Sequence, residues 1–157
     1  MARHALSKKD LKALQEKLKQ NNLWGAFLEN ALIEVEEHKN RKCFSIGGTI
    51  IAMEDREFLP SLELINALKP VEHFLTVDDG AVPHIMNGAK LFGKGVVEVG
   101  NDITEGSMVF IRDLKGKYIA VGKALKNGAD LEVSKEGAAA DVILIPGRNP
   151  CQDGSGR

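Results

Sequence analysis

Short apolar stretches between glycine turns dominate the second half of the chain, and they constrain its fold most strongly. Between Val71 and Pro146 the sequence contains HFLTV, GVVEV, GSMVFIRD, GKYIAVGKAL and ADVILI in succession. Each stretch has about the length of a strand and is rich in β-branched or aromatic residues. Regularly spaced short strands of this kind predict a compact β-barrel. A single helix, around residues 79–87, is expected to interrupt them.

The earlier part of the chain carries a different pattern, which predicts helices before and after a small antiparallel sheet. Residues 7–20, SKKDLKALQEKLKQ, begin with Ser7 and Asp10 in the spacing of a capping box and place leucines on one face. Residues 31–55 contain short apolar stretches separated by turn-forming residues, as strands do. A second helix is expected in FLPSLELINALKP, where it should stop at Pro70.

The change of pattern at about residues 69–72 predicts two domains and an α+β fold class. A small N-terminal α+β domain, residues 1–70, should precede a β-barrel domain, residues 71–147. Residues 148–157 carry no apolar pattern, and we expect them to form a disordered tail.

Cysteine and histidine usage argues against a metal or redox site. Cys43 and Cys151 are too few and too far apart in sequence for a disulfide framework or a zinc site, so free thiols are expected. The four histidines are scattered, and no metal or other cofactor is predicted. No apolar run approaches the ~20 residues that span a bilayer, and the N-terminus lacks the apolar core of a secretory signal. A soluble cytoplasmic protein is the expectation.

Residues 88–95, GAKLFGKG, nearly match the nucleotide-binding P-loop. Two features oppose that interpretation. Gly95 stands where the P-loop has the hydroxyl that holds Mg²⁺, and the expected order of helix, glycine turn and strand is the reverse of the one a P-loop needs. Nucleotide hydrolysis is therefore the weakest of the functions considered, and the glycines need another explanation.

Basic residues concentrate locally although the formal net charge of the chain is only −1. Residues 112–126 contain five basic side chains and one acid, Asp113. Such a segment is either a solvated hairpin with ordinary surface lysines or a set of phosphate contacts. Charge alone leaves both interpretations open.

The glycine pattern of this region resembles the RNA-binding PUA domain, named for pseudouridine synthases and archaeosine transglycosylases. The resemblance covers roughly residues 72–146 and rests on VDDGAVPHIMNGAKLFGKGVVEV followed by GSMVFIRDLKGKYIAVGKAL. It departs from many members at residues 92–95, where they have a proline before the Gly-Val pair. With the preceding helix-and-hairpin domain, the chain is similar to stand-alone archaeal PUA proteins and to translation factors of the malignant T-cell-amplified sequence and ligatin type.

The resemblance implies an RNA-facing surface formed by the helix near residues 79–87, the strand after it and the hairpin around residue 115. Lysines and arginines there would contact phosphates, while Phe92 and Tyr118 would stack on unpaired bases. Phe92 could instead belong to the protein core, and Tyr118 could instead pack across the strand pair. The residues expected at the RNA are Gly80, Ala81, His84, Asn87, Gly88, Lys90, Phe92, Lys94, Gly95, Arg112, Lys115, Lys117, Tyr118, Lys123 and Lys126.

No residue set indicates catalysis. Asp78 and Asp79 are adjacent, so their carboxylates should point in different directions, and helix capping explains them better than acid–base chemistry. A Cys43–His84 dyad would need the domains to pack in one particular way. Enzymes that carry a PUA domain place catalysis in a separate, larger domain, and we expect a protein that is not an enzyme.

Two functions remain open. The first is RNA binding in translation or RNA modification, with tRNA, through its acceptor end, or rRNA of the small ribosomal subunit as ligand. The second is a protein-interaction adaptor in which residues 1–70 recruit a partner. It is favoured by the twelve acids against ten bases in residues 71–157. Neither function involves a membrane.

Overall fold

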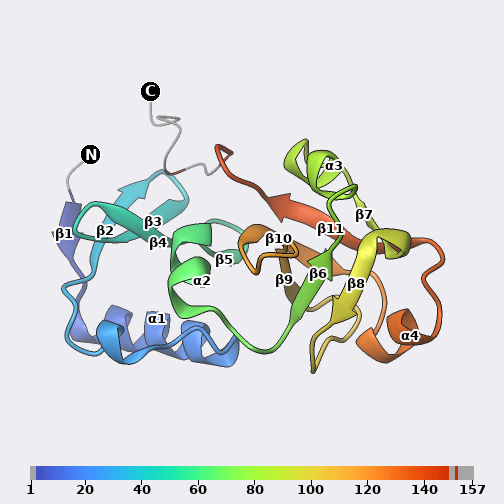
Figure 1. Ribbon diagram of the computed structural model, residues 1–157. Coiled ribbons are helices and arrows are strands. Elements are labelled where there is room, and N and C mark those ends of the chain that lie inside the picture. Colours follow the sequence, from blue (N-terminus) through green and yellow to red (C-terminus); the bar gives the residue numbers. More distant parts are fainter. Residues whose placement is uncertain (1–2, 149–150, 152–157) are drawn as a thin grey trace. The chain divides into compact units, whose positions relative to one another are not determined.

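The computed structural model describes residues 3–148 and Cys151, and its elements are drawn in Figure 1. The chain divides into two compact units. One contains the chain up to Leu68 together with Cys151, and the other is Lys69–Arg148. Each unit combines helices with a β-sheet, which confirms the predicted α+β class.

The N-terminal unit is built on a five-stranded antiparallel sheet in which every strand pairs with its neighbour along the chain. Its long helix begins after Ser7, whose Oγ accepts a hydrogen bond from the amide of Asp10 at 3.2 Å. That helix buries Leu14 and Leu18, as its predicted apolar face requires. The elements are β1 (Arg3–Ala5), α1 (Lys8–Gln20), η1 (Ala26–Leu28), β2 (Glu34–His38), β3 (Arg41–Ile46), β4 (Thr49–Glu54), β5 (Phe58–Pro60) and α2 (Leu62–Leu68).

A disulfide joins Cys43 on β3 to Cys151, so the prediction of free thiols is wrong. The two residues are 108 positions apart in sequence, but their Cα atoms lie 6.0 Å apart, within the usual range for a disulfide. Distance along the chain is a poor guide here, because the polypeptide returns to the N-terminal unit after it has formed the second one. Of the predicted disordered tail, the structure describes Arg148 and Cys151, and the rest lies outside the described residues.

The second unit is a curled six-stranded sheet in the order β7-β11-β10-β9-β6-β8, a half-barrel where the sequence predicted a barrel. All neighbouring strands are antiparallel except β6 and β9, which are parallel. The elements are β6 (Phe74–Val77), α3 (Val82–Met86), β7 (Leu91–Phe92), η2 (Gly93–Gly95), β8 (Val96–Val99), β9 (Met108–Arg112), β10 (Tyr118–Ala124), α4 (Gly128–Val133) and β11 (Ala138–Leu144).

Helix α4 corrects the prediction of a single helix in this half of the chain. It has only six residues, too few to display a 3.6-residue repeat in the sequence. The helix is nevertheless anchored, because Leu131 is buried in the core of the unit.

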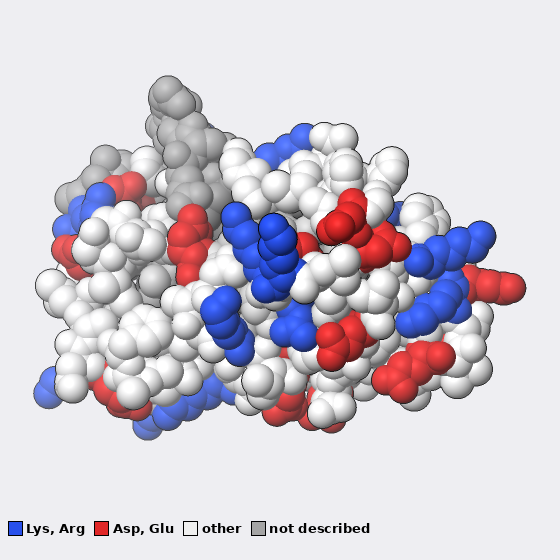
Figure 2. All heavy atoms as spheres, in the orientation of Figure 1, with Lys and Arg blue, Asp and Glu red and all other residues white. Residues whose placement is uncertain are grey.

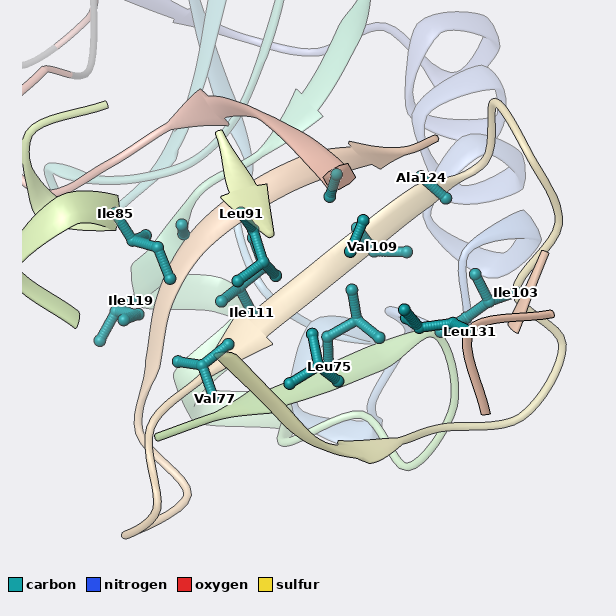
Figure 3. Packing of buried hydrophobic residues seen from close by; sticks show 14 of the residues in the cluster. Leu75, Val77, Ile85, Leu91, Ile103, Val109, Ile111, Ile119, Ala124 and Leu131 are labelled. Carbon is teal, nitrogen blue, oxygen red and sulfur yellow. The ribbon is translucent and has the colours of Figure 1, made fainter. Parts of the chain in front are cut away.

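The core of the half-barrel lies inside the curl of the sheet, where α3 and α4 contribute one buried side chain each (Figure 3). Leu75 and Val77 are two positions apart on β6 and both belong to this core, because side chains two residues apart on a strand share a face. Ile85 of α3 and Leu91 of β7 reach the same cluster, and both are about 1% exposed. Since burying such a side chain contributes roughly 1.5–3 kcal/mol, this contact fixes α3 and the segment that follows it against the sheet.

Candidate nucleic-acid interface

A cavity of about 470 Å³ lies beside α3 in the second unit. Its walls come from two neighbouring stretches of sequence, one running into α3 and the other from the end of α3 to the start of β8. The lining residues are Asp78, Gly80, Ala81, His84, Ile85, Ala89, Lys90, Leu91, Phe92, Lys94 and Gly95.

One backbone hydrogen bond ties the two walls together, and a second hydrogen bond fixes the turn in the first wall. The amide of Asp78 donates to the carbonyl of Gly95 at 2.9 Å, and the Asp78 carboxylate accepts from the amide of Ala81 at 2.9 Å. Gly95 also lies close to the opposite wall, since a Cβ at this position would be 2.9 Å from the Cβ of Ala81. Residue 95 therefore has to lack a side chain for the two walls to lie this close together.

Gly88 ends α3 in the left-handed conformation that favours glycine, with φ of 83°. Its amide donates to the carbonyl of Ile85 at 2.8 Å. The chain then enters β7, η2 and β8, so a strand and not a helix follows the GAKLFGKG stretch. This order excludes the P-loop, and the glycines instead terminate a helix and narrow a cavity.

The cavity combines apolar walls with two lysines and a histidine. Ile85 and Leu91 are buried, whereas His84, Lys90 and Lys94 are exposed. The Phe92 side chain is 57% exposed, so its ring is open to solvent. An apolar recess with a few positive groups and an exposed aromatic ring suits a planar heterocycle attached to phosphate.

Seven of the residues expected at the RNA line this cavity: Gly80, Ala81, His84, Lys90, Phe92, Lys94 and Gly95. Asn87 and Gly88 lie on the same segment, between α3 and the lining residue Ala89, without lining the cavity themselves. Asp78, Ile85, Ala89 and Leu91 also line the cavity but were not among the residues named from the sequence. Ile85 and Leu91 are apolar, and their role as walls follows only from the position of α3 on the sheet.

The basic segment of residues 112–126 does not form one surface. Lys115 and Lys117 lie at the turn between β9 and β10, while Lys123 and Lys126 lie at the other end of β10. Because a strand rises about 3.3 Å per residue, Lys117 and Lys123 are roughly 20 Å apart. Figure 2 shows Lys and Arg interspersed with Asp and Glu on the face that it presents.

Lys123 is connected to one lining residue of the cavity through Asp141. Its register partner on β11 is Asp141, and the carboxylate of Asp141 is 3.3 Å from the ammonium of Lys90, a lining residue. Lys126, further along, donates to the backbone carbonyl of Glu136. The carboxylate that pairs with Lys90 therefore belongs to the residue opposite Lys123.

Arg112 is engaged in contacts within the sheet, although its side chain is 23% exposed. Its guanidinium carbon lies 3.8 Å from the centre of the Phe74 ring, and its Nε donates to Thr76 Oγ1 at 2.8 Å. Nη2 is 3.3 Å from the carboxylate of Glu98. These contacts use the stacking face and the donors of the guanidinium, so Arg112 has a structural role in the sheet.

Tyr118 cannot be a base-stacking residue, because its side chain is only 1% exposed. Its hydroxyl donates to the carbonyl of Pro70 at 2.6 Å, and its ring makes an edge-to-face contact with Phe110. Burial raises the pKa of the Tyr118 hydroxyl, although the nearby Arg112 guanidinium lowers it by a smaller amount. The alternative for this ring, packing across the strand pair, is therefore correct.

The proposed catalytic sets do not assemble. The sulfur of Cys43 is bonded to Cys151 and provides no thiol for a dyad with His84. The carboxylate of Asp78 caps the turn before α3, in agreement with the capping interpretation. Among residues 3–148 and Cys151, no three side chains of the metal-ligating types form a cluster.

Comparison with known proteins identifies both units. Residues 73–145 match the family model of the PUA domain, and residues 2–68 match the family described as a domain of unknown function (DUF1947). A solved structure described as a conserved PUA domain protein from Thermoplasma acidophilum superimposes with a TM-score of 0.87 and 33% identity. The alignment covers 94% of this chain and 96% of that one.

Two further relatives come from Methanocaldococcus jannaschii. An uncharacterised protein is 29% identical over 147 residues, which cover 87% of each chain. A probable tRNA pseudouridine synthase B is 36% identical over 89 residues, 53% of this chain but only 26% of that enzyme. Since the Thermoplasma protein is similar over nearly its whole length and the PUA model matches the half-barrel, the chain belongs to the PUA domain proteins, with a DUF1947 domain before its PUA domain.

Proposed function

We propose that this PUA domain protein is a non-catalytic RNA-binding protein in translation or RNA modification. Its cavity would hold an unpaired end of a structured RNA, such as the acceptor end of tRNA or an rRNA element. The observation that carries the proposal is the cavity beside α3, which places Lys90, Lys94 and His84 around apolar walls. The similarity of 89 residues of the chain to part of a probable tRNA pseudouridine synthase supports RNA as the ligand.

The physical argument starts from the shape of the cavity. At about 470 Å³ it lies within the range that encloses small organic groups. Apolar walls can pack on the face of a nucleobase, and stacking on a side chain such as Phe92 contributes about 1–3 kcal/mol. Unpaired nucleotides expose such faces, whereas bases within an RNA duplex do not.

The charge of the cavity lysines is the second reason to expect RNA as the ligand. The ammonium groups of Lys90 and Lys94 are exposed at the cavity, where they can neutralise neighbouring phosphates. Each phosphate contact on a single strand changes the slope of log affinity against log salt by about 0.7. Binding should therefore weaken as salt rises, even though the whole chain has a formal net charge of −1.

The test is binding of fluorescently labelled tRNA, with and without its 3′ single-stranded end, at two salt concentrations. A Lys90→Gln/Lys94→Gln variant should lose affinity by more than tenfold, and Lys8→Gln/Lys9→Gln on α1 is the control of equal charge change. Wild-type affinity that does not depend on salt, or that equals the affinity for an unrelated polyanion, contradicts the proposal. Dependence on the 3′ end identifies the acceptor end as the part that is bound.

A protein-interaction adaptor is the second candidate. It is favoured by an apolar groove in the N-terminal unit, lined in part by Ile46, Ile51, Leu64 and the 54% exposed ring of Phe27. An apolar groove with an exposed aromatic ring at it is a surface that a protein partner could cover. If recruitment is the function, Phe27→Ser should abolish capture of the partner, while the Lys90→Gln/Lys94→Gln variant should leave it unchanged.

A cytoplasmic location is part of the proposal. No helix in the described part of the chain is both long and apolar enough to cross a membrane. The Cys43–Cys151 disulfide is unusual for a cytoplasmic protein, since disulfides are rare in reducing compartments except in proteins from hyperthermophiles. Measuring the free-thiol content of protein trapped at lysis tests whether the bond is present in the cell.

A further inference from the structure

The carboxylate of Asp78 lies at the cavity beside α3, close to both of its walls. A Cβ built on Gly80 would be 3.5 Å from Asp78 Oδ1, and a Cβ built on Gly95, on the opposite wall, would be 4.0 Å from the same atom. Asp78 is half-buried, whereas the cavity lysines, Lys90 and Lys94, are exposed. The site therefore has an acidic group where its walls meet and basic groups that are open to solvent.

Asp78 has hydrogen-bonding capacity that the protein does not use. Its Oδ1 accepts a hydrogen bond from the amide of Ala81 at 2.9 Å. Within residues 3–148 and Cys151, its Oδ2 accepts no hydrogen bond and its carboxylate forms no ion pair. Lys90, the lining residue that could neutralise it, is paired with Asp141 instead. Because a carboxylate accepts hydrogen bonds and donates none, Asp78 offers only acceptors to a ligand in the cavity.

This distribution of charge restricts which chemical form of an RNA end can enter. A phosphate beside Asp78 would bring two negative groups together, and neither group can donate a hydrogen bond. A hydroxyl can donate, and its hydrogen bond to a carboxylate is of the strong, charge-assisted kind. The last ribose of an RNA with an unmodified 3′ end carries phosphate on its 5′ side and two neighbouring hydroxyls, at 2′ and 3′, on its other side. Such a ribose can donate to Asp78 while its phosphate stays at the exposed lysines.

We propose that the cavity selects RNA whose 3′-terminal ribose carries free 2′- and 3′-hydroxyls, and that Asp78 is the residue that determines this specificity. The inference rests on the proposed RNA binding and adds to it a discrimination between chemical forms of the same end. The lysines attract phosphate wherever it occurs along the strand. Asp78 rejects a terminal phosphate, so an RNA that ends in a 3′-phosphate is a poor ligand.

The experiment measures binding of the wild-type protein to one single-stranded RNA sequence, labelled at its 5′ end and prepared with four different 3′ ends. These ends are the 2′,3′-diol, the 2′-deoxy form, the 3′-deoxy form and the 3′-phosphate. Removal of one hydroxyl should weaken binding about threefold to tenfold, because a hydrogen bond to a charged group is lost. The 3′-phosphate should weaken binding by more than about tenfold through repulsion from Asp78.

General attraction between the lysines and phosphate predicts the opposite order, because the 3′-phosphate adds negative charge to the RNA. Affinity for the 3′-phosphate that equals or exceeds the affinity for the diol therefore overturns the inference. This comparison is made in the wild type and does not depend on the folding of any variant.

Asp78→Asn tests the role of the residue itself. The amide oxygen can still accept from Ala81, since asparagine caps as well as aspartate does, while the charge is removed and the second oxygen becomes a donor. The preference for the diol over the 3′-phosphate should fall to about twofold or less. Asp79→Asn is the matched control, because Asp79 is an exposed acid next in sequence that does not line the cavity. It removes the same charge and should keep the full preference.

The outcomes separate this inference from the proposed function. A full preference for the diol in Asp78→Asn overturns the role of Asp78. Equal wild-type affinity for both ends, with Lys90→Gln/Lys94→Gln impaired toward both, overturns the inference and leaves the proposed function standing. Absence of RNA binding by the wild type overturns the proposed function and this inference with it.

Discussion

The ammonium of Lys90 lies 3.3 Å from the carboxylate of Asp141, so one of the two cavity lysines is already paired within the protein. Both side chains are about half exposed, at 55% and 48%. An ion pair of this exposure is worth about 0.2–1 kcal/mol, and it competes with a phosphate for the same ammonium group. Asp141 also faces Lys123 across the β10–β11 pair.

Removing the charge of Asp141 should therefore strengthen RNA binding. Asp141→Asn frees Lys90 at little cost in stability, and we expect affinity to rise about twofold to fivefold, since 1 kcal/mol corresponds to about fivefold. Fluorescence anisotropy at low salt measures the effect, which should shrink as salt rises. Glu105→Gln is the control, because Glu105 is an exposed acid in the loop before β9 that does not line the cavity. Unchanged affinity in Asp141→Asn would show that Lys90 does not meet phosphate.

Tyr118→Phe should lower stability without affecting RNA binding. The substitution removes the hydroxyl that donates to Pro70 and leaves a buried carbonyl unpaired, which costs about 1–3 kcal/mol. Urea denaturation measures the free energy of unfolding, and the anisotropy assay measures affinity. A variant of normal stability that loses RNA affinity would restore Tyr118 as a direct RNA contact.

The buried hydroxyl of Tyr118 predicts a loss of stability at alkaline pH. Its pKa in the folded protein is raised above the ordinary value of 10.0, chiefly by burial, so the unfolded state releases this proton first as pH rises. The stabilising contribution is complete below pH 10 and is lost as pH rises through the folded pKa. Tyr118 is the only tyrosine in the chain, so tyrosinate absorbance reports it alone. A titration midpoint at or below pH 10 in the folded protein would contradict this prediction.

Reduction of the disulfide should destabilise the N-terminal unit. Cross-linking residues 108 positions apart stabilises by at most about 4.7 kcal/mol in the chain-entropy model, and by less if the second unit stays folded within the loop. Cys151→Ser should therefore lower the unfolding midpoint of the N-terminal unit more than that of the half-barrel. Trp24 fluorescence follows the first unit and Tyr118 absorbance the second, because each is the only residue of its type. Equal midpoints in oxidised and reduced protein would be inconsistent with a stabilising bond.

The close approach of the two cavity walls can be tested by substituting Gly95 and Ala81. Gly95→Ala places a Cβ 2.9 Å from the Cβ of Ala81 and should cost about 1–3 kcal/mol through overpacking. The backbone at residue 95 is not in the left-handed region, so crowding is the whole expected effect. Ala81→Gly in the same protein should recover most of the loss. If the double variant does not recover stability, the cost of Gly95→Ala does not come from its contact with residue 81.

The residues of the cavity could largely be predicted because they are close together in sequence. His84, Lys90 and Lys94 lie on one continuous segment, in which a helix, its glycine stop and the next strand start are each visible as local patterns. Strands β6, β8, β9, β10 and β11 were likewise predictable from their apolar stretches. Helix α4 and the three-residue strands β1 and β5 are too short to show a period.

What could not be predicted depends on contacts between distant segments. The pairing of Cys43 with Cys151 and the position of Arg148 against Gly88 both follow from the path of the chain after β11. Tyr118 was ambiguous for a different reason. Its strand, YIAVGKA, is buried at every position except Lys123, so the alternation that would separate an inward from an outward ring is missing.

The most direct test of RNA binding at the cavity is an NMR titration of the ¹⁵N-labelled protein with a short single-stranded RNA that ends in a 3′ hydroxyl. Our account predicts that the largest amide shifts fall within residues 78–95 and that they are abolished in Lys90→Gln/Lys94→Gln. Shifts confined to the turn at Lys115 and Lys117 or to the N-terminal unit, or no shifts at all, would contradict it.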